Sequence, residues 1–297
     1  MLSYQHAWHA GNFADVHKHL VLYALIERLM QKKSAISFID THAGRGLYPL
    51  AEATTARLGE YRDGVLPLWE AYAKKGVGEA TLTRFGKCLA KAQPGRALDC
   101  YPGSPWWLSQ ALRPQDRLTL FERHPGEYRH LEGADLGRVA PTGGDSESAS
   151  AGRERIHRQY GDGLGGLLQR LPVNTPRLCV LIDPAWEMKG EYREVADTLA
   201  AMVKKVRHAV VLIWYPLLPD GRHQTLLEGI RGHGLRNVWR SELVRYAPQH
   251  VRGLYGSGLL LLNPPWQLGA ELDSALAALA ALYGGEAAHK SDQWLPE

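Results

Sequence analysis

The sequence predicts an α/β protein built on a mostly parallel sheet. Short, continuous apolar runs recur along the chain, and Arg177–Ile182 and Ala209–Tyr215 are the clearest. Such runs are typical of strands buried on both faces of a parallel sheet, and segments of helical periodicity separate them. Polar residues follow several of these runs, Asp183 among them. Because open α/β sheets bind ligands at the carboxyl ends of their strands, these positions are candidates for a site.

Composition is compatible with one large domain. The chain has 297 residues, 45% of them hydrophobic, and a net charge of +4 with neutral histidines, which permits a nucleic-acid partner without requiring one. Three cysteines without metal-ligand spacing indicate the reduced thiols of a cytoplasmic protein. The chain has neither a signal-peptide pattern nor the apolar run of about 20 residues needed to span a bilayer. We therefore expect a soluble, cytoplasmic monomer that does not bind membranes.

Seven strands and several helices follow from the hydrophobic pattern. The expected strands are Ala35–Ile39, Asp116–Phe121, Ile156–Tyr160, Arg177–Ile182, Ala209–Tyr215, Val238–Tyr246 and Gly258–Leu262. The expected helices are Leu20–Lys33, Trp106–Leu112, Tyr192–Val206 and His223–Gly232. Residues 47–99 interrupt the alternation with the helical segments Ala51–Leu58, Val65–Lys75 and Ala80–Ala92, which predicts a small helical insertion after the first strand. Residues 133–152 are rich in small and polar residues and are expected to form a disordered surface loop.

The loop after the first strand has the composition of a cofactor cradle. Asp40-Thr41-His42-Ala43-Gly44-Arg45-Gly46 places an acid and two glycines directly after a buried strand. Glycines let the backbone approach a ligand, and the acid holds its polar groups. The third glycine of dinucleotide-binding loops is missing, which favours S-adenosylmethionine over a nicotinamide cofactor. A tight turn from strand to helix is the alternative interpretation.

Asp183-Pro184-Ala185-Trp186 follows the fourth strand and suits methylation of an exocyclic amine on a base. The lone pair of such a nitrogen is delocalised into the ring. The Asp183 carboxylate and the Pro184 carbonyl are two acceptors that could draw its N–H groups out of plane. Trp186 offers a ring on which a flipped base can stack. In the alternative interpretation, Asp-Pro ends the strand in a turn and the tryptophan belongs to the core.

Three further residues follow strand ends or begin a helix. Glu122 can accept the ribose hydroxyls of a cofactor, and Asp162, flanked by Gly161 and Gly163, can meet its adenine amine. Ser104 is suited to cap the helix that follows it, a role compatible with a ligand contact. The alternatives are a surface glutamate in an ion pair, an Asp-Gly turn and a purely structural cap.

The N-terminal segment 1–19 is crowded with polar aromatic residues and is expected to be too polar for the core. It contains Tyr4, His6, Lys18 and His19, and we interpret it as a flap that meets a base and a phosphate. An arm packed on the body is the alternative. Its histidines lack a cysteine or carboxylate cluster to complete a metal site, so no metal is expected.

A second motif, Asn263-Pro264-Pro265-Trp266, matches the amine-activating pattern better in its local chemistry. Its position argues against it. Asp183 ends the fourth strand, next to the loop after the first, whereas Asn263 ends the seventh, away from the central crevice. We therefore prefer Asp183 as the catalytic residue.

Together these segments resemble the RlmJ family of bacterial 23S ribosomal RNA adenine-N6 methyltransferases. The resemblance rests on Tyr4-Gln5-His6, Gly11–His19, Asp40–Gly46, Tyr101–Pro105 and Leu181–Met188, and it covers nearly the whole chain. It implies a Rossmann-like class I methyltransferase fold with seven strands, and S-adenosylmethionine as cofactor. One departure is Ala185, where the family pattern has a second proline, which leaves the Pro184 carbonyl in place but less rigidly held.

The resemblance also assigns roles. It places His19, His42, Ser104, Glu122, Gly161, Asp162 and Asp183 at the cofactor, turns Tyr4, His6 and Lys18 toward the RNA, and makes Asp183 the catalytic acceptor. Three alternatives remain: an adenine-N6 methyltransferase acting on DNA, a nicotinamide-dependent dehydrogenase, and an RNA-binding protein whose methyltransferase fold is no longer catalytic.

Overall fold

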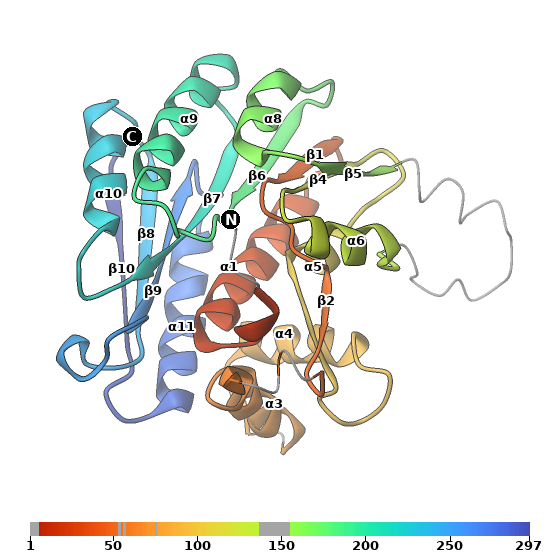
Figure 1. Ribbon diagram of the computed structural model, residues 1–297, viewed down its shortest axis with the longest axis vertical. Coiled ribbons are helices and arrows are strands. Elements are labelled where there is room, and N and C mark those ends of the chain that lie inside the picture. Colours follow the sequence, from red (N-terminus) through yellow and green to blue (C-terminus); the bar gives the residue numbers. More distant parts are fainter. Residues whose placement is uncertain (1–5, 53–54, 56–57, 75, 137–154) are drawn as a thin grey trace, which may run out of the picture.

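The computed structural model describes residues 6–52, 55, 58–74, 76–136 and 155–297, and within them an eight-stranded sheet has helices on both faces (Figure 1). The strands of this sheet are β1 (Ile36–Asp40), β4 (Arg117–Glu122), β5 (Ile156–Tyr160), β6 (Arg177–Ile182), β7 (Val210–Leu217), β8 (Val238–Val244), β9 (Gly256–Leu262) and β10 (Ala288–Leu295). A separate antiparallel pair is formed by β2 (Leu47–Pro49) and β3 (Cys100–Pro102).

The α-helices among the described residues are α1 (Phe13–Met30), α3 (Val65–Ala73), α4 (Ala80–Lys91), α5 (Ser104–Gln110), α6 (Pro125–Gly133), α8 (Gly163–Arg170), α9 (Glu191–Lys205), α10 (His223–Gly232) and α11 (Leu268–Tyr283). Short 3-10 turns occur at η1 (His6–Trp8), η2 (Glu60–Arg62) and η3 (Pro248–His250). None of the described helices is both long enough and apolar enough to cross a membrane.

The strand order is β10-β8-β9-β7-β6-β1-β4-β5. From β7 to β5 the neighbouring strands run parallel, whereas β9 runs antiparallel to both β7 and β8. After β1 the chain builds β4 and β5 on one side, and it then returns to build β6 and β7 on the other. A switch point of this kind opens a crevice at the carboxyl ends of β1 and β6.

Two hydrophobic clusters hold the layers together. One joins the sheet to α1, α5, α11 and the helices α3 and α4, and the other joins its opposite face to α8, α9 and α10 (Figure 1). Neighbouring residues of β6 alternate between the clusters, because Leu181 belongs to the first and Ile182 to the second. The central strands are therefore buried on both faces, as their continuous apolar sequences predict.

The predicted α/β class is confirmed, but the sheet has eight strands instead of seven. The additional strand, β10, pairs antiparallel with β8 at the edge of the sheet. Its sequence, AHKSDQWL, is mostly polar and largely exposed, so the apolar pattern that marks the central strands is missing. Edge strands of this kind are difficult to recognise from hydrophobicity alone.

The N-terminal segment contradicts the prediction that it is too polar for the core. Helix α1 begins at Phe13, where Asn12 caps it by accepting a hydrogen bond from Asp15 N at 2.9 Å, instead of at Leu20. Every residue from Phe13 to Leu20 is buried. The polar side chains are tolerated because they bond to one another and to polar groups of the sheet.

The expected insertion contains α3 and α4, which pack against each other and against α11. Helix α4 also packs against α1, and the β2–β3 pair joins the two ends of the insertion. Residues 53, 54, 56 and 57 of the predicted helix Ala51–Leu58 lie outside the described residues. Most of the predicted 133–152 loop does too. Its first residues are ordered, since Gly133 ends α6 and Leu136 is buried.

Gly258 allows β9 to pack against β7, and replacing it should destabilise the fold. A Cβ at this position would lie 2.1 Å from ring atoms of Tyr215, its cross-strand partner. We expect Gly258→Ala to lower the free energy of unfolding by about 2 kcal/mol, because the buried ring has to move. Urea denaturation measures this change. Gly232→Ala, at the end of α10 with open space around it, is the matched control and should leave the free energy of unfolding unchanged or raise it by up to about 1 kcal/mol.

Candidate active site

The loop after β1 is fixed to the strands on either side of it. Thr41 N and Thr41 Oγ1 both donate hydrogen bonds to the Leu181 carbonyl of β6, at 3.1 and 3.0 Å. On the other side, Ala43 N donates to the Phe121 carbonyl of β4 at 2.8 Å. The loop thus spans the crevice at the switch point, and its position follows from main-chain bonds to both strands.

A pocket opens at the carboxyl ends of β1, β4 and β6, and most of the predicted site residues line it. They are His6, Lys18, His19, His42, Ser104, Glu122, Asp162, Asp183 and Pro184. Gly161 and Trp186 do not line the pocket, and Tyr4 lies outside the described residues. Residues from six separate stretches of the sequence therefore meet where the strand order reverses.

Glu122, at the end of β4, orders the cofactor loop. One carboxylate oxygen accepts a hydrogen bond from Gly44 N at 2.8 Å, and the other accepts one from His124 N at 2.6 Å. Burial raises the pKa of this carboxyl, and the hydrogen bonds from the two backbone N–H groups oppose the rise. Each oxygen keeps a second lone pair, so the group can accept further hydrogen bonds from a diol.

Asp162 and Gly163 form the opposite wall. Asp162 caps α8 by accepting a hydrogen bond from Gly165 N at 2.8 Å. A Cβ on Gly163 would lie 1.9 Å from the Thr41 carbonyl oxygen, so only glycine lets α8 approach the cofactor loop this closely. The sequence showed Gly163 as a flank of Asp162, but it gave no sign of this close contact. Gly161 instead follows β5, and its main-chain N donates a hydrogen bond to the Glu122 carbonyl oxygen at 2.9 Å.

Ser104 lines the pocket, but it does not cap α5 as predicted. The N-cap residue is Gly103, without a side-chain cap, and Ser104 is the first residue of the helix. Asp40 lies nearby, fully buried. Its Oδ1 accepts a hydrogen bond from His42 N at 3.1 Å, whereas its Oδ2 has no partner among the described residues. Burial raises the pKa of Asp40 to about 7, although Ser104 and the His42 amide favour the charged form.

Two neutral imidazoles complete this side of the pocket. Burial lowers the pKa of His42 to about 4 and the pKa of His19 well below its usual range. His19 Nδ1 bonds to the Tyr101 hydroxyl at 2.8 Å, while the buried Nε2 has no partner in the part of the chain that the structure describes. A buried ring nitrogen without a partner beside a pocket is suited to a polar ligand. The amino acid portion of S-adenosylmethionine offers such groups, so the residues present fit this cofactor.

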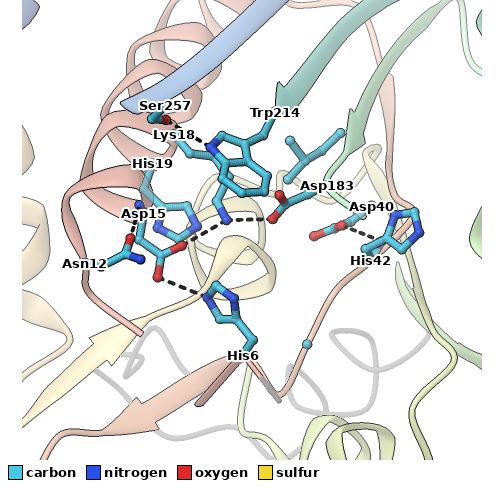
Figure 2. A network of polar contacts seen from close by, with 12 residues as sticks. His6, Asn12, Asp15, Lys18, His19, Asp40, His42, Asp183, Trp214 and Ser257 are labelled. Carbon is cyan, nitrogen blue, oxygen red and sulfur yellow. Dashed lines mark hydrogen bonds and ion pairs between the residues drawn. The ribbon is translucent and has the colours of Figure 1, made fainter. Parts of the chain in front are cut away.

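Lys18 and Asp183 form a buried ion pair at the centre of the site (Figure 2). Lys18 Nζ lies 2.6 Å from Asp183 Oδ2 and 2.9 Å from Asp15 Oδ1. Although burial opposes it, the two carboxylates raise the pKa of Lys18. Burial raises the pKa of Asp183, and Lys18 opposes that rise. Lys18 therefore lines the pocket with its ammonium held by two carboxylates, and its role toward a phosphate of the RNA stays a prediction.

His6 joins the same cluster from the N-terminal turn η1. Its Nε2 lies 3.0 Å from Asp15 Oδ2 (Figure 2). Its ring also meets the ring of Tyr48 edge-on, with centroids 5.2 Å apart. Burial opposes the charged form, yet the neighbouring Asp15 raises the pKa of His6. Asp15 also accepts a hydrogen bond from Gly11 N at 2.9 Å. Sequence reasoning missed Asp15, although its spacing of three residues from Lys18 on one helix could have indicated the pair.

Trp186 does not present a ring to the pocket. It has a positive φ of 57°, is 4% exposed and stacks on Tyr192 with ring centroids 4.4 Å apart. This placement agrees with the alternative interpretation of the motif, in which the tryptophan belongs to the core. Asp183 and Pro184 thus line the pocket, while the predicted stacking surface does not.

The second candidate motif lies at the opposite ends of the strands from the pocket. Because β9 is antiparallel to β7, Asn263 follows the end of β9 near the beginning of β7. Its side-chain amide donates to the carbonyls of Arg207 and Ala209 at 2.9 and 2.8 Å. Asn263 therefore has a structural role in joining these two segments. Among the described residues, no group of three or more His, Cys, Asp and Glu side chains is arranged to hold a metal ion.

Comparisons with known proteins agree with this geometry. The family model described as "Ribosomal RNA large subunit methyltransferase D, RlmJ" matches residues 33–296. The chain is 32% identical over 296 residues to Ribosomal RNA large subunit methyltransferase J of Escherichia coli K12, covering 99% of each chain. It is 31% identical over 280 residues to the protein of the same name from Haemophilus influenzae, covering 94% of this chain and 93% of the other.

A solved structure has the same fold over nearly the full length. This protein from Legionella pneumophila superposes with a TM-score of 0.83 at 28% sequence identity, and the match covers 96% of this chain and 98% of the other. The family model covers the pocket residues from His42 onward, and the Escherichia coli relative, matched over 99% of this chain, also extends over those of η1 and α1. The chain therefore belongs to the RlmJ family of ribosomal RNA large subunit methyltransferases.

Proposed function

We propose that this protein transfers a methyl group from S-adenosylmethionine to the N6 amine of an adenine in 23S ribosomal RNA. The observation that carries the proposal is the position of Asp183. Its carboxylate lies in the same pocket as the cofactor loop, one strand away from it, in a member of a ribosomal RNA methyltransferase family. Family membership supplies the reaction and the class of RNA, and the pocket supplies the residues that would perform the reaction.

The cofactor side of the pocket is formed by the β1 loop, β4 and α8. When bound, S-adenosylmethionine supplies a methyl group on a positively charged sulfur. Glu122 is placed to accept hydrogen bonds from the ribose hydroxyls, and His19 Nε2 is placed to bond to the amino acid portion. Asp162 and Gly161 follow β5, and the Asp162 carboxylate would accept a hydrogen bond from the adenine amine of the cofactor. His42 and Ser104 line the same pocket.

The acceptor side is formed by Asp183 and Pro184. Lys18 occupies Oδ2 of Asp183, and within the described residues Oδ1 receives no hydrogen bond. Oδ1 can therefore accept one N–H of an adenine amine, and the Pro184 carbonyl can accept the other. Both bonds localise the lone pair of the nitrogen and orient it toward the methyl group. They become stronger as the amine gains positive charge, which is the condition for lowering the barrier.

Lys18 has two effects on this acceptor. Its ammonium opposes the rise that burial causes in the pKa of Asp183, which favours the ionised carboxylate. It also fixes the carboxylate in one orientation, because both ends of the contact are almost completely buried. Lys18 is in turn held by Asp15, which makes α1 part of the catalytic centre.

The N-terminal residues are proposed as the RNA side of the site. His6 lines the pocket next to the Lys18–Asp15 pair, on the side where an adenine would enter. The relatives are named as methyltransferases of ribosomal RNA, which favours RNA over DNA as the substrate and a catalytic protein over a non-catalytic one. A monomer and a cytoplasmic location stay predictions from the sequence.

We expect Glu122→Gln to weaken S-adenosylmethionine binding about tenfold or more, as judged by titration calorimetry. The change replaces one carboxylate oxygen by an amide that faces a backbone N–H, and it removes a charged acceptor for the ribose. Glu132→Gln, on the exposed surface of α6, is the matched control and should bind normally. Wild-type affinity in Glu122→Gln would contradict the assigned ribose contact, and binding of NAD in place of S-adenosylmethionine would contradict the cofactor.

Asp183→Asn should slow methyl transfer by about a hundredfold or more and change the dissociation constant of S-adenosylmethionine much less. Asparagine keeps an acceptor oxygen, but it lacks the charge that stabilises the developing cation. Single-turnover incorporation of labelled methyl groups into 23S ribosomal RNA measures the rate, and calorimetry measures the affinity.

Asn263→Ala tests the second motif in the same assay. It removes two bonds to carbonyls at the opposite edge of the sheet, so it should lower the melting temperature but keep the rate at low temperature. A rate for Asp183→Asn close to that of the wild type would reject Asp183 as the acceptor. A comparable loss of rate in Asn263→Ala would restore the second motif as a candidate.

A further inference from the structure

Trp214 lies beside Asp183 on the neighbouring strand, on the side away from the cofactor loop. In the parallel register of β6 and β7, Ile182 pairs with Ile213, so Asp183 and Trp214 come next at the same level. Leu181 and Leu212, two residues earlier in each case, both belong to the cluster that packs against α1. Because alternate residues share a face of a sheet, Asp183 and Trp214 both point toward α1.

The indole ring of Trp214 completes the surroundings of the Lys18 ammonium. Lys18 Nζ lies 5.7 Å from the centroid of this ring, as well as within hydrogen-bond distance of Asp15 and Asp183 (Figure 2). An ammonium has three N–H donors, and two of them are used by the carboxylates. The electron-rich face of the indole is a favourable neighbour for the remaining positive charge of this buried ammonium.

A buried chain of hydrogen bonds fixes the position of Trp214. Its Nε1 donates to Ser257 Oγ at 2.9 Å, and Ser257 Oγ bonds to His17 Nδ1 at 2.9 Å. His17 Nε2 continues to Ser241 Oγ at 2.9 Å, and Ser241 Oγ bonds to His289 Nε2 at 2.8 Å. The chain therefore runs from the active site through β9, α1 and β8 to the edge strand β10.

One arrangement of protons satisfies every link of this chain. Burial lowers the pKa of His17 well below its usual range, so its ring is neutral and carries one N–H. Ser257 accepts from Trp214 and donates to His17 Nδ1, and His17 Nε2 then donates to Ser241, which donates to His289. Each hydroxyl accepts one hydrogen bond and donates one. The indole is held in this way by a network in which the two serines and His17 are fully buried.

We propose that Trp214, held by Ser257 and His17, is a positioning residue that keeps the Lys18 ammonium on Asp183. This inference rests on the proposed function, because it gives Trp214 a part in the same methyl transfer. It also explains why two consecutive residues of α1 are polar and buried: His17 orients the indole and Lys18 lies against it. Neither Trp214 nor His17 was recognised as functional from the sequence.

The proposal has a pH signature that a structural role lacks. The charged and titratable groups near the Asp183 carboxylate are Lys18 and Asp15 from α1, His6 from η1 and Asp40 from β1. Of these, Lys18 has the largest effect in favour of the ionised form. If Lys18 moves away, the pKa of Asp183 rises further. The rate falls when Asp183 is protonated, so the acidic limb of the pH–rate profile should move to higher pH.

The test compares Trp214→Leu, Trp214→Phe and Ser257→Ala in single-turnover methylation of 23S ribosomal RNA. We expect Trp214→Leu to reduce the rate about tenfold and to move the acidic limb up by about half a pH unit. Trp214→Phe keeps a ring face and should lie between Trp214→Leu and the wild type. Ser257→Ala removes the acceptor behind the indole and should shift the limb in the same direction. The S-adenosylmethionine dissociation constant should change less than about threefold, because none of these residues lines the cofactor pocket.

Tyr215→Phe is the matched control. Tyr215 is the next residue of β7 and is fully buried. Its hydroxyl donates a hydrogen bond to Glu242 Oε1 at 2.8 Å, which the variant removes. Its side chain belongs to the cluster on the opposite face of the sheet. This variant should lose stability and keep the wild-type pH profile. A shift of similar size in Tyr215→Phe would mean that general loosening of the strand causes the effect, and it would overturn the proposal.

A second readout does not depend on activity. Acetic anhydride reacts with deprotonated, accessible amines, and mass spectrometry of peptides measures the reaction at Lys18 against the exposed Lys32 and Lys33. Trp214→Leu and Ser257→Ala should loosen the contact between Lys18 and Asp183, which lowers the pKa of Lys18. Its acetylation should then increase severalfold, because one pKa unit is a tenfold change in the deprotonated fraction. Tyr215→Phe should not change it. If the wild type methylates no ribosomal RNA, the proposed function fails, and Lys18 reactivity still decides the role of Trp214. Folded variants with unchanged Lys18 reactivity and an unchanged pH profile would overturn it.

Discussion

The buried ammonium of Lys18 is the constraint on which the site depends. A charge in the interior is tolerated only when it is paired and hydrogen-bonded, and here Asp15 and Asp183 provide both kinds of partner. One partner belongs to the same helix and the other to the end of β6. The pair thus fixes how α1 lies on the sheet as well as where the Asp183 carboxylate points. The packing of α1 and the geometry of the site consequently depend on the same two contacts.

Topology decides between two motifs that local chemistry cannot separate. Asp183 and Asn263 each follow a strand and precede a proline. Because β6 and β9 run in opposite directions, the two residues lie at opposite ends of the strands. The cofactor loop lies at the same ends of the strands as Asp183. Thr41 of this loop donates hydrogen bonds to the Leu181 carbonyl of β6. The direction of a strand thus determines whether an activating motif can reach a cofactor.

The sequence predicted those parts of the molecule that follow from regular hydrophobicity. The seven apolar strands and the position of Asp40, Glu122 and Asp183 at their ends were recognisable in this way. The first turns of α1 were not, because their polar residues are buried through partners such as Ser257 and Asp183, more than a hundred residues away in the sequence. The orientation of Trp186 depends on a positive φ and on Tyr192, which no sequence pattern records. Prediction failed where long-range polar contacts, rather than periodicity, determine burial.

The charges of the ion-pair cluster have a consequence for the exchange of cofactor. Lys18 and a protonated His6 balance Asp15 and Asp183, but the rest of the pocket lining adds more carboxylates than cations, which leaves an excess of negative charge: Glu122, Glu127, Asp162, Glu191 and Glu194 against Arg123. A sulfonium ion close to Asp183 would balance this excess, whereas the thioether left after methyl transfer is uncharged. The pocket therefore discriminates electrostatically between the two forms of its cofactor, attracting the reactant and relaxing its hold on the product. Turnover benefits, because the demethylated molecule leaves a site that favours a cation.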